Sequence, residues 1–323
     1  MAGQRHLDRK LRLQHFRAVD AIAAQGSLLK AAAVLGLTQP GLSKTLHEAE
    51  VVVGAKLFER HPRGVVATAA GLAFIDSARK MIAELRRLDE ALDVVGDPGR
   101  GALTLGVLPV AASGMLPGAL TRLRVARPEI HVRVQQGRTG DLTPLLAAGE
   151  IDLIVGRLYE PTTPDGFERE PMWREPIAVL ARAGHPIFAH AKVEQEHLAA
   201  YDFALPTMSQ RVGQEIELLV RQLGLEPRVA FRSSSYDFIR ELLIGGDFLS
   251  LVPSLMMAGD LMRGALQLAP LPIPAAPRLA GIIRPPARPL TPAARAFIDV
   301  LVGFVGELAE RGLADITIGN IGV

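Results

Sequence analysis

The 323-residue sequence contains no cysteine, and this absence removes several classes of function at once. A chain without thiols cannot form disulfides, bind a metal through thiolates or use a cysteine nucleophile. Its eight histidines lie far apart, without the close spacing of metal ligands. We therefore expect neither a metal centre nor any other cofactor.

Long apolar runs and targeting signals are also missing. A membrane-spanning helix needs about 20 consecutive apolar residues, and no stretch of the sequence approaches that length. Residues 1–6 carry neither the apolar segment nor the cleavage site of a secretion signal. We expect a cytoplasmic protein without a membrane partner.

Catalytic signatures are absent as well. The sequence has no glycine-framed nucleophile elbow, no phosphate-binding loop, no dinucleotide fingerprint and no convincing acid pair at a strand end. We therefore expect no enzymatic activity. The composition, 49% hydrophobic and 22% charged, is ordinary for a soluble protein, and the length suggests two or three domains.

Charge is unevenly distributed along the chain. The net charge is only +2, but residues 1–68 contain ten basic and five acidic side chains, so the remainder is slightly acidic. A basic head on an acidic body is typical of a DNA-binding module joined to a domain that does not bind DNA.

The stretch from Ser27 to Glu50 predicts two short helices separated by a tight turn. Its first half carries an apolar stripe with helical spacing at Leu28, Ala31, Ala32 and Leu35. Gly36 suits the left-handed end of this helix. Thr38 can cap the amides of the next helix, and Pro40 fits that helix's first turn.

The second helix of this stretch has a polar face suited to reading DNA. Leu42, Leu46 and Ala49 share its apolar face. Gln39, Ser43, Lys44 and His47 fall mostly on the opposite face, where glutamine can pair with adenine and lysine can meet guanine or phosphate. The alternative is an ordinary helical hairpin with a solvated polar side.

Residues 51–68 favour the DNA-binding interpretation. Their pattern predicts a strand, a turn and a second strand, which together would form a wing. Arg60 and Arg63 would then be placed to meet phosphate or a narrow minor groove.

Residues 13–71 resemble the winged helix-turn-helix of LysR-type transcriptional regulators. The resemblance rests on Phe16, Gly26, Ser27, Ala31, Ala32, Leu35, Thr38, Gln39, Pro40, Leu42, Ser43, Lys44, Glu50, Gly54, Leu57, Phe58, Glu59, Arg60, Arg63, Gly64, Thr68 and Gly71. Gly41 departs from it, since the family usually has alanine or a similar residue there. The resemblance implies double-stranded DNA as partner, and the expected contacts are Thr38, Gln39, Pro40, Ser43, Lys44, Arg60 and Arg63.

A long helix is predicted over residues 69–96. Its apolar positions recur at three or four residues, at Leu72, Ile75, Ala78, Ile82, Leu85, Leu88, Leu92 and Val95. Such a seam favours pairing with a second copy, and packing against its own chain is the alternative. In the family this segment is the dimerising linker helix, which implies a homodimer or homotetramer on a two-fold related site, with RNA polymerase as a further partner.

From residue 101 the pattern becomes strands alternating with helices, which predicts a mainly parallel sheet. We expect an α/β fold in which residues 97–323 form an effector-binding domain of two lobes. The first lobe covers about 101–172 and 273–311, and the second about 173–272. The arrangement resembles periplasmic binding proteins and the effector domain of LysR-type regulators. Residues 1–68 and 69–96 would form the DNA-binding domain and the linker.

An effector is expected where loops leave the strand ends, because free amides and hydroxyls there favour an anion. We predict a small anionic or hydroxylated effector, most simply a carboxylate. The candidate contacts are Val110, Ser113, Arg138, Thr139, Thr207, Ser209, Ser233 and Ser234. Arg138 and Arg211 would supply counter-charge. The resemblance implies a contact at Thr139, whereas Val110 lacks the hydroxyl for the corresponding contact; for each residue, helix capping is the alternative.

The sequence is thus interpreted as a DNA-binding transcriptional regulator of LysR type controlled by a small molecule. The alternatives are a solute-binding protein or an enzyme built on the two lobes. Export of the protein would favour the first alternative, and substrate turnover without DNA retention would favour the second.

Overall fold

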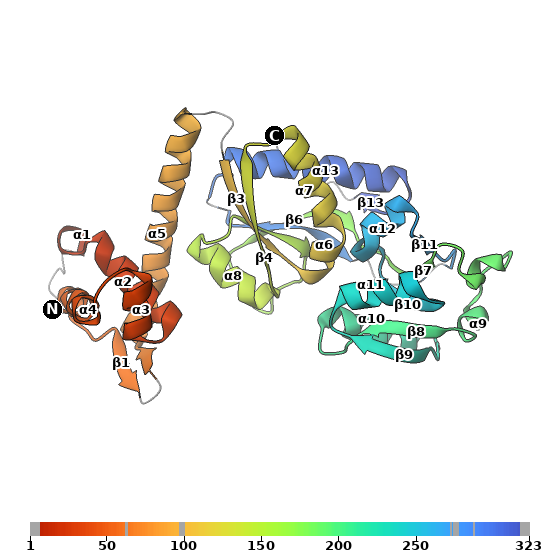
Figure 1. Ribbon diagram of the computed structural model, residues 1–323, viewed down its shortest axis with the longest axis horizontal. Helices are drawn as coiled ribbons and strands as arrows, with labels where there is room; N and C mark the ends of the chain where they lie inside the picture. Colours follow the sequence, from red (N-terminus) through yellow and green to blue (C-terminus); the bar gives the residue numbers. More distant parts are fainter. Residues whose placement is uncertain are drawn as a thin grey trace. The chain divides into compact units, whose positions relative to one another are not determined.

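The computed structural model describes residues 7–61, 64–96, 101–271, 273, 278–286 and 288–316. The chain forms an N-terminal, mainly helical unit and a two-lobed α/β unit (Figure 1). None of the helices in the described ranges combines the length and apolar character needed to cross a lipid bilayer.

The N-terminal unit contains the predicted helix-turn-helix and wing. Its elements are α1 (Leu7–Lys10), α2 (Leu13–Gln25), α3 (Leu28–Val34), α4 (Gln39–Val53), β1 (Phe58–His61), β2 (Gly64–Ala67) and α5 (Ala69–Gly96). The wing is shorter than residues 51–68 suggested, because Val51–Val53 continue α4 until Gly54 ends the helix with a left-handed backbone.

Local capping fixes both helices of the motif. The Ser27 hydroxyl accepts a hydrogen bond from the amide of Lys30 (3.5 Å), and the Thr38 hydroxyl accepts one from the amide of Gly41 (3.3 Å). Gly36 has the expected positive φ of 65°. A Cβ at Gly41 would lie only 3.1 Å from the Thr38 hydroxyl oxygen, so glycine leaves room for the cap.

The end of α4 is tied to the wing by a buried carboxylate. Glu50 accepts hydrogen bonds from the backbone amide of Leu57 (3.0 Å) and from Lys56 Nζ (2.6 Å). Beneath this link lies a core in which Leu42, Ala49 and Leu57 are fully buried. Helix α4 is therefore fixed to the rest of this unit by both the buried carboxylate and the apolar core.

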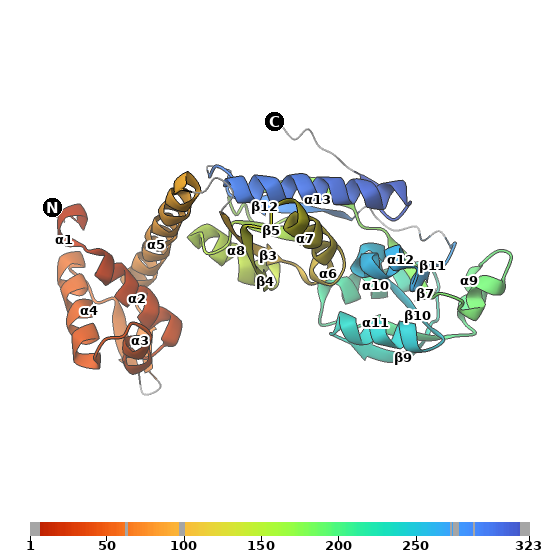
Figure 2. The ribbon, with the colours of Figure 1, turned by 45° about the horizontal axis from the view of Figure 1, so that its top comes forward.

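The first lobe is built on a six-stranded sheet of order β13-β6-β12-β5-β3-β4. Its elements are β3 (Gly101–Val107), α6 (Pro109–Ser113), α7 (Met115–Ala126), β4 (Ile130–Gln136), α8 (Thr139–Ala148), β5 (Leu153–Arg157), β6 (Glu168–Arg174), β12 (Leu279–Arg284), α13 (Pro292–Glu310) and β13 (Asp315–Ile316). The long helix α13 returns to cover this lobe beside α7 (Figure 2).

The second lobe is built on a five-stranded sheet of order β11-β7-β10-β8-β9. Its elements are β7 (Ile177–Arg182), the 3-10 helix η1 (Pro186–Ala189), α9 (Gln195–Leu198), β8 (Asp202–Pro206), α10 (Arg211–Gln222), β9 (Arg228–Ser233), α11 (Tyr236–Gly245), β10 (Phe248–Pro253), the 3-10 helix η2 (Ser254–Met257), α12 (Ala258–Arg263) and β11 (Leu266–Leu268).

The expectation of mainly parallel sheets is wrong, because three of the five strand pairings in the first lobe and two of the four in the second are antiparallel. The strands β5-β3-β4 and β10-β8-β9 run parallel, but β6, β12 and β13 in the first lobe and β7 and β11 in the second pair antiparallel. A helical crossover between two consecutive strands makes them run parallel. Several of the antiparallel strands are instead those through which the chain enters or leaves a lobe.

The two crossings between the lobes lie side by side. The first leads from β6 to β7 and the second enters β12, and the backbone amide of Glu175 donates to the carbonyl of Arg278 (2.8 Å). Trp173, just before the first crossing, is fully buried in the core of the first lobe and pairs with Ala280. This crossing forms the hinge of the two-lobed unit.

Candidate functional site

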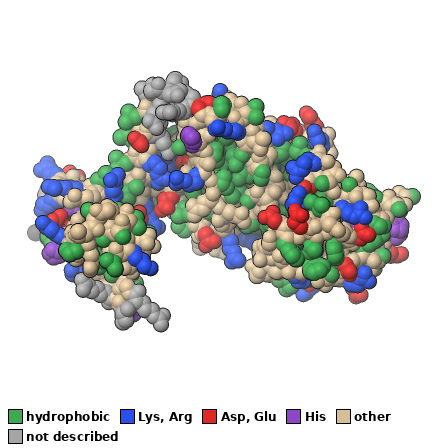
Figure 3. Space-filling view, in the orientation of Figure 1, with side chains coloured by type: hydrophobic (Ala, Val, Ile, Leu, Met, Phe, Trp, Pro, Cys, Tyr) green, Lys and Arg blue, Asp and Glu red, His purple; other side chains and the backbone are tan. Residues whose placement is uncertain are grey.

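The outer face of α4 presents the side chains that the sequence predicted for DNA contact. Thr38, Gln39, Pro40 and Lys44 are exposed, and Ser43 is half-buried. In Figure 3, Lys and Arg side chains lie along the left margin of this unit, over α1 and α4. The side chain of Arg60, and Arg63 as a whole, lie outside the residues that the structure describes.

A cavity of about 370 Å³ lies between the two lobes, where loops leave the ends of parallel strands. This volume falls in the range of roughly 300–1,000 Å³ typical of small-molecule sites. Its lining residues are Leu108, Pro109, Val110, Arg138, Thr139, Gly140, Arg157, Tyr159, Ser209, Gln210, Arg211, Val212, Gln214 and Tyr236.

Four of the eight predicted effector contacts line this cavity, namely Val110, Arg138, Thr139 and Ser209. Ser113, Thr207, Ser233 and Ser234 are not among its lining residues. Thr207 supports the cavity indirectly, because its hydroxyl is 2.8 Å from that of Ser209. The carbonyl of Ser234 accepts a hydrogen bond from Gln210 Nε2 (2.8 Å), and the Ser233 hydroxyl accepts one from the amide of Ser235 (3.0 Å).

Sequence reasoning missed Arg157 and Tyr159, which follow the first-lobe strand β5. The candidate loops were chosen between a strand and a helix, and no helix follows β5 before β6. Their position at the carboxyl end of a strand could nevertheless have predicted both residues. The strands β5 and β3 pair parallel, so both end at the same edge of the sheet.

Arginines converge on Tyr159 at one side of the cavity. The Arg211 guanidinium lies 3.8 Å from the centre of the Tyr159 ring, and that of Arg157 lies 5.5 Å from it. Burial lowers the pKa of Arg157, while the nearby Tyr159 and Glu175 oppose this shift. With Arg138, three arginines line the cavity, and no aspartate or glutamate among the described residues does.

A buried ion pair between Arg278 and Glu175 lies at the hinge. Arg278 and Glu175 are 4% and 1% exposed, and Nη2 of Arg278 lies 3.7 Å from Oε2 of Glu175. Arg278 also pairs with Glu215 of α10, so its guanidinium joins the hinge to the second lobe. Burial raises the pKa of Glu175 and lowers that of Arg278, although each partner opposes the shift of the other.

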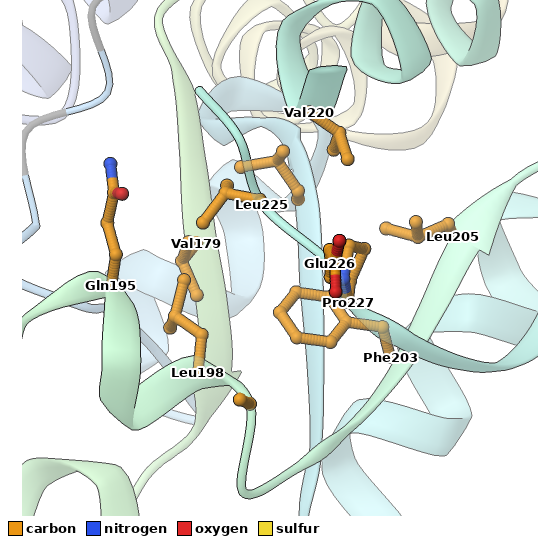
Figure 4. A pocket seen from close by; sticks show the side chains of 11 residues that line it. Val179, Gln195, Leu198, Phe203, Leu205, Val220, Leu225, Glu226 and Pro227 are labelled. Atoms are coloured by element: carbon orange, nitrogen blue, oxygen red, sulfur yellow. The ribbon is translucent and has the colours of Figure 1, made fainter. Parts of the chain in front are cut away.

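A smaller cavity of about 40 Å³ lies inside the second lobe. Figure 4 shows Leu198, Phe203 and Leu225 around this space. A single water needs about 10–15 Å³ by the same measure, so this cavity has room for only a few solvent-sized molecules. It is a packing gap in an apolar core rather than a metabolite site. Among the described residues there is also no cluster of His, Asp or Glu side chains that could hold a metal ion.

Comparison with known proteins agrees with this architecture. Residues 13–72 match the family model described as the bacterial regulatory helix-turn-helix protein, lysR family, and residues 96–305 match the LysR substrate binding domain. The chain is 27% identical to the HTH-type transcriptional regulator PcaQ of Agrobacterium fabrum, across 82% of this chain and 86% of PcaQ. It is 30% identical to the HTH-type transcriptional regulator GalR of Pseudomonas putida, across 85% and 69%.

Solved structures with the same fold include full-length OxyR from Pseudomonas aeruginosa, with a TM-score of 0.61 and 23% identity over 91% of this chain and 94% of OxyR. Full-length CbnR in complex with its target DNA has a TM-score of 0.62 and 20% identity over 91% of this chain and all of CbnR. A winged helix-turn-helix followed by a two-lobed domain defines a DNA-binding transcriptional regulator with an effector-binding domain. The chain belongs to the LysR family of these regulators.

The hinge ion pair gives a prediction about stability. Replacing Arg278 with methionine leaves Glu175 buried without its main partner, so Arg278→Met should lower the free energy of unfolding by about 3–5 kcal/mol. The double variant Arg278→Met/Glu175→Gln should recover part of this loss, because it removes the buried charge. Urea unfolding of both variants and the parent measures the effect, and a double variant less stable than the single one would contradict it.

The loss should also depend on pH. A carboxyl group whose folded pKa is raised binds its proton more tightly in the folded state, so the unfolding free energy falls as pH rises through the interval between the unfolded and folded values. The charge of Arg278 opposes this rise, so its removal should raise the pKa of Glu175 further, and Arg278→Met should be less impaired relative to the parent at about pH 5 than at about pH 8. The double variant should lack the part of the pH dependence that comes from the carboxyl group of Glu175.

Proposed function

We propose that the outer face of α4 reads DNA and that the wing contacts the backbone beside it. Thr38, Gln39, Pro40, Ser43 and Lys44 would supply the contacts from α4, with Arg60 and Arg63 from the wing. The support for base contact is that Gln39 and Lys44 are exposed on the face opposite the buried Leu42. Residues 1–68 would form the DNA-binding domain, residues 69–96 the linker and residues 97–323 the effector-binding domain.

Lys44→Ala tests this interface. Loss of one phosphate or guanine contact should weaken DNA retention and reduce the slope of log affinity against log salt by about 1 per protomer. Binding of DNA fragments selected by the parent protein, measured over a range of salt concentrations, gives both quantities. Lys80→Ala is the matched control, since Lys80 is an exposed lysine paired with Asp76 on α5. Equal effects of the two substitutions would contradict the assignment.

We further propose that the chain works as a homodimer or homotetramer joined through α5. Part of the predicted seam packs on the N-terminal unit itself, where Ile75 and Ala78 are buried. Further along the helix, Met81, Leu85, Leu88 and Leu92 remain exposed. Their spacing of four, three and four residues is that of a coiled-coil seam, and an apolar stripe of this kind favours a second copy.

Leu88→Glu should disrupt this assembly. The side chain is 55% exposed within one chain, so a glutamate there can be accommodated in the monomer but places two carboxylates in the dimer seam. The dimer dissociation constant should rise about 100-fold or more by sedimentation equilibrium. Leu29→Glu, at a leucine of α3 that is 68% exposed, should leave the assembly unchanged. An unaltered Leu88→Glu dimer would show that α5 does not join the subunits.

We propose that the cavity between the lobes binds a small carboxylate effector. The observation that carries this proposal is the lining itself, in which arginines from both lobes meet without an acidic side chain from the described part of the chain. Such a site favours an anion, and helix α8 begins at Thr139 with its positive dipole end at the cavity. Effector binding would change the angle between paired DNA-binding units rather than create DNA affinity.

Footprinting with and without small acids tests this mechanism. The protein bound to a selected fragment should protect a different stretch of DNA once an acid that binds the cleft is added. A protected region that never changes with any bound acid would contradict the mechanism. A regulator of this kind would act in the cytoplasm together with RNA polymerase and without enzymatic turnover, as its relatives' identity as transcriptional regulators supports.

A further inference from the structure

We propose that the effector is a dicarboxylate, held with one carboxylate between Arg157 and Arg211 and the other at Arg138. This inference rests on the proposed function of the cleft and names the class of molecule that would fill it. It follows from the number, placement and pairing of the charged side chains at the cavity.

The first anion position lies between Arg157 and Arg211. Arg157 comes from the end of β5 in the first lobe, and Arg211 begins α10 in the second. One Arg157 nitrogen, Nη1, donates to the carbonyl of Leu279 (3.1 Å), but its Nε is buried without a hydrogen-bond partner in the described chain. Arg211 stacks on Tyr159 and forms no ion pair with the described residues. A guanidinium group without an ion-pair partner can donate two parallel hydrogen bonds to one carboxylate.

The acidic groups nearest to this position are already engaged. Glu175 and Glu215 both pair with Arg278, behind Tyr159. Asp141 lies at the start of α8, where its side chain accepts a hydrogen bond from the backbone amide of Arg138 (3.3 Å), and it is not among the residues that line the cavity. The described lining residues include three guanidinium groups, those of Arg138, Arg157 and Arg211, and no carboxylate. A single carboxylate would therefore leave the lining with an excess of positive charge.

The second anion position is provided by Arg138 at the start of α8. The Arg138 side chain lines the cavity and, in the part of the chain that the structure describes, forms no ion pair. Thr139 and Gly140 follow it at the N-terminus of this ten-residue helix. Arg138 follows β4, and Arg157 is the last residue of β5. Because β3 lies between these two strands in the sheet, the two anion positions are separate.

Apolar and aromatic groups form part of the remaining cavity wall, beside the polar Ser209, Gln210 and Gln214. Leu108, Val110 and Val212 belong to its wall, together with the ring of Tyr236. These side chains suit a short hydrocarbon spacer. A phosphate monoester would concentrate its charge at one point, whereas two separated positions with an apolar wall favour two carboxylates joined by carbon.

Calorimetric titration of the full chain can test the class directly. The probes are succinate, adipate and suberate, with hexanoate as the monoacid of the same length as adipate and glycerol phosphate as the single-point dianion. The best diacid should bind about 10-fold or more tightly than hexanoate, as expected for one additional charge-assisted contact. The dependence on chain length measures the separation of the two positions.

Two variants assign the positions. Arg211→Gln and Arg138→Gln should each reduce the diacid preference over hexanoate to about 3-fold or less, because each removes one anion position. Arg221→Gln is the matched control, since Arg221 lies on the same helix as Arg211, is exposed and pairs with Glu217 instead of lining the cavity. Thermal unfolding checks that all three variants fold.

The outcomes separate this inference from the proposed function. Equal affinity for adipate and hexanoate, with both weakened by Arg211→Gln, would overturn the dicarboxylate while leaving a carboxylate effector. Preference for glycerol phosphate would likewise overturn the dicarboxylate. Binding of none of the acids at about 10 mM, a concentration that reveals even weak sites, would overturn both.

Discussion

The two-lobed unit depends on the buried contact at its hinge. A guanidinium and a carboxylate are removed from water at the point where the chain crosses twice between the lobes, and loss of Arg278 would leave Glu175 buried without its main partner. Because Arg278 also reaches Glu215 on α10, the same side chain restrains the second lobe. Tyr159 connects this hinge to the cavity, since it lies beside Arg278 and also forms part of the wall against which an effector would rest. The cavity wall and the hinge contact thus share one side chain.

The N-terminal unit was largely predictable because short-range chemistry determines it. The helix cap at Thr38 and the left-handed turn at Gly36 can be predicted from the adjacent sequence alone. The structure confirms both. The apolar spacing of Leu42, Leu46 and Ala49 likewise gave the buried face of α4. The role of Gly41 was not predictable, since its lack of a side chain matters only through the distance to the Thr38 hydroxyl.

The effector unit was harder because its contacts join distant segments. β6 contains Pro171, which argues against a strand, yet the sheet accommodates it through a register shift opposite Ala280 and Gly281. A Cβ at Gly281 would collide with the carbonyl of Glu170, so this glycine allows the close approach. The positions of strand ends predicted Arg138 and Ser209 as cavity residues. The pairing of Glu175 with Arg278, however, joins residues about a hundred positions apart, and no local sequence pattern indicates it.

Trp173 is the only tryptophan in the chain, and its indole is fully buried directly beside the crossing. The carboxyl group of Glu175 lies two positions further along the chain and interacts with this indole. The emission of an indole responds to nearby charge and to water. The native protein thus carries an intrinsic optical reporter at its hinge, and any rearrangement of the two lobes can be followed on the unlabelled chain without introducing a foreign fluorophore.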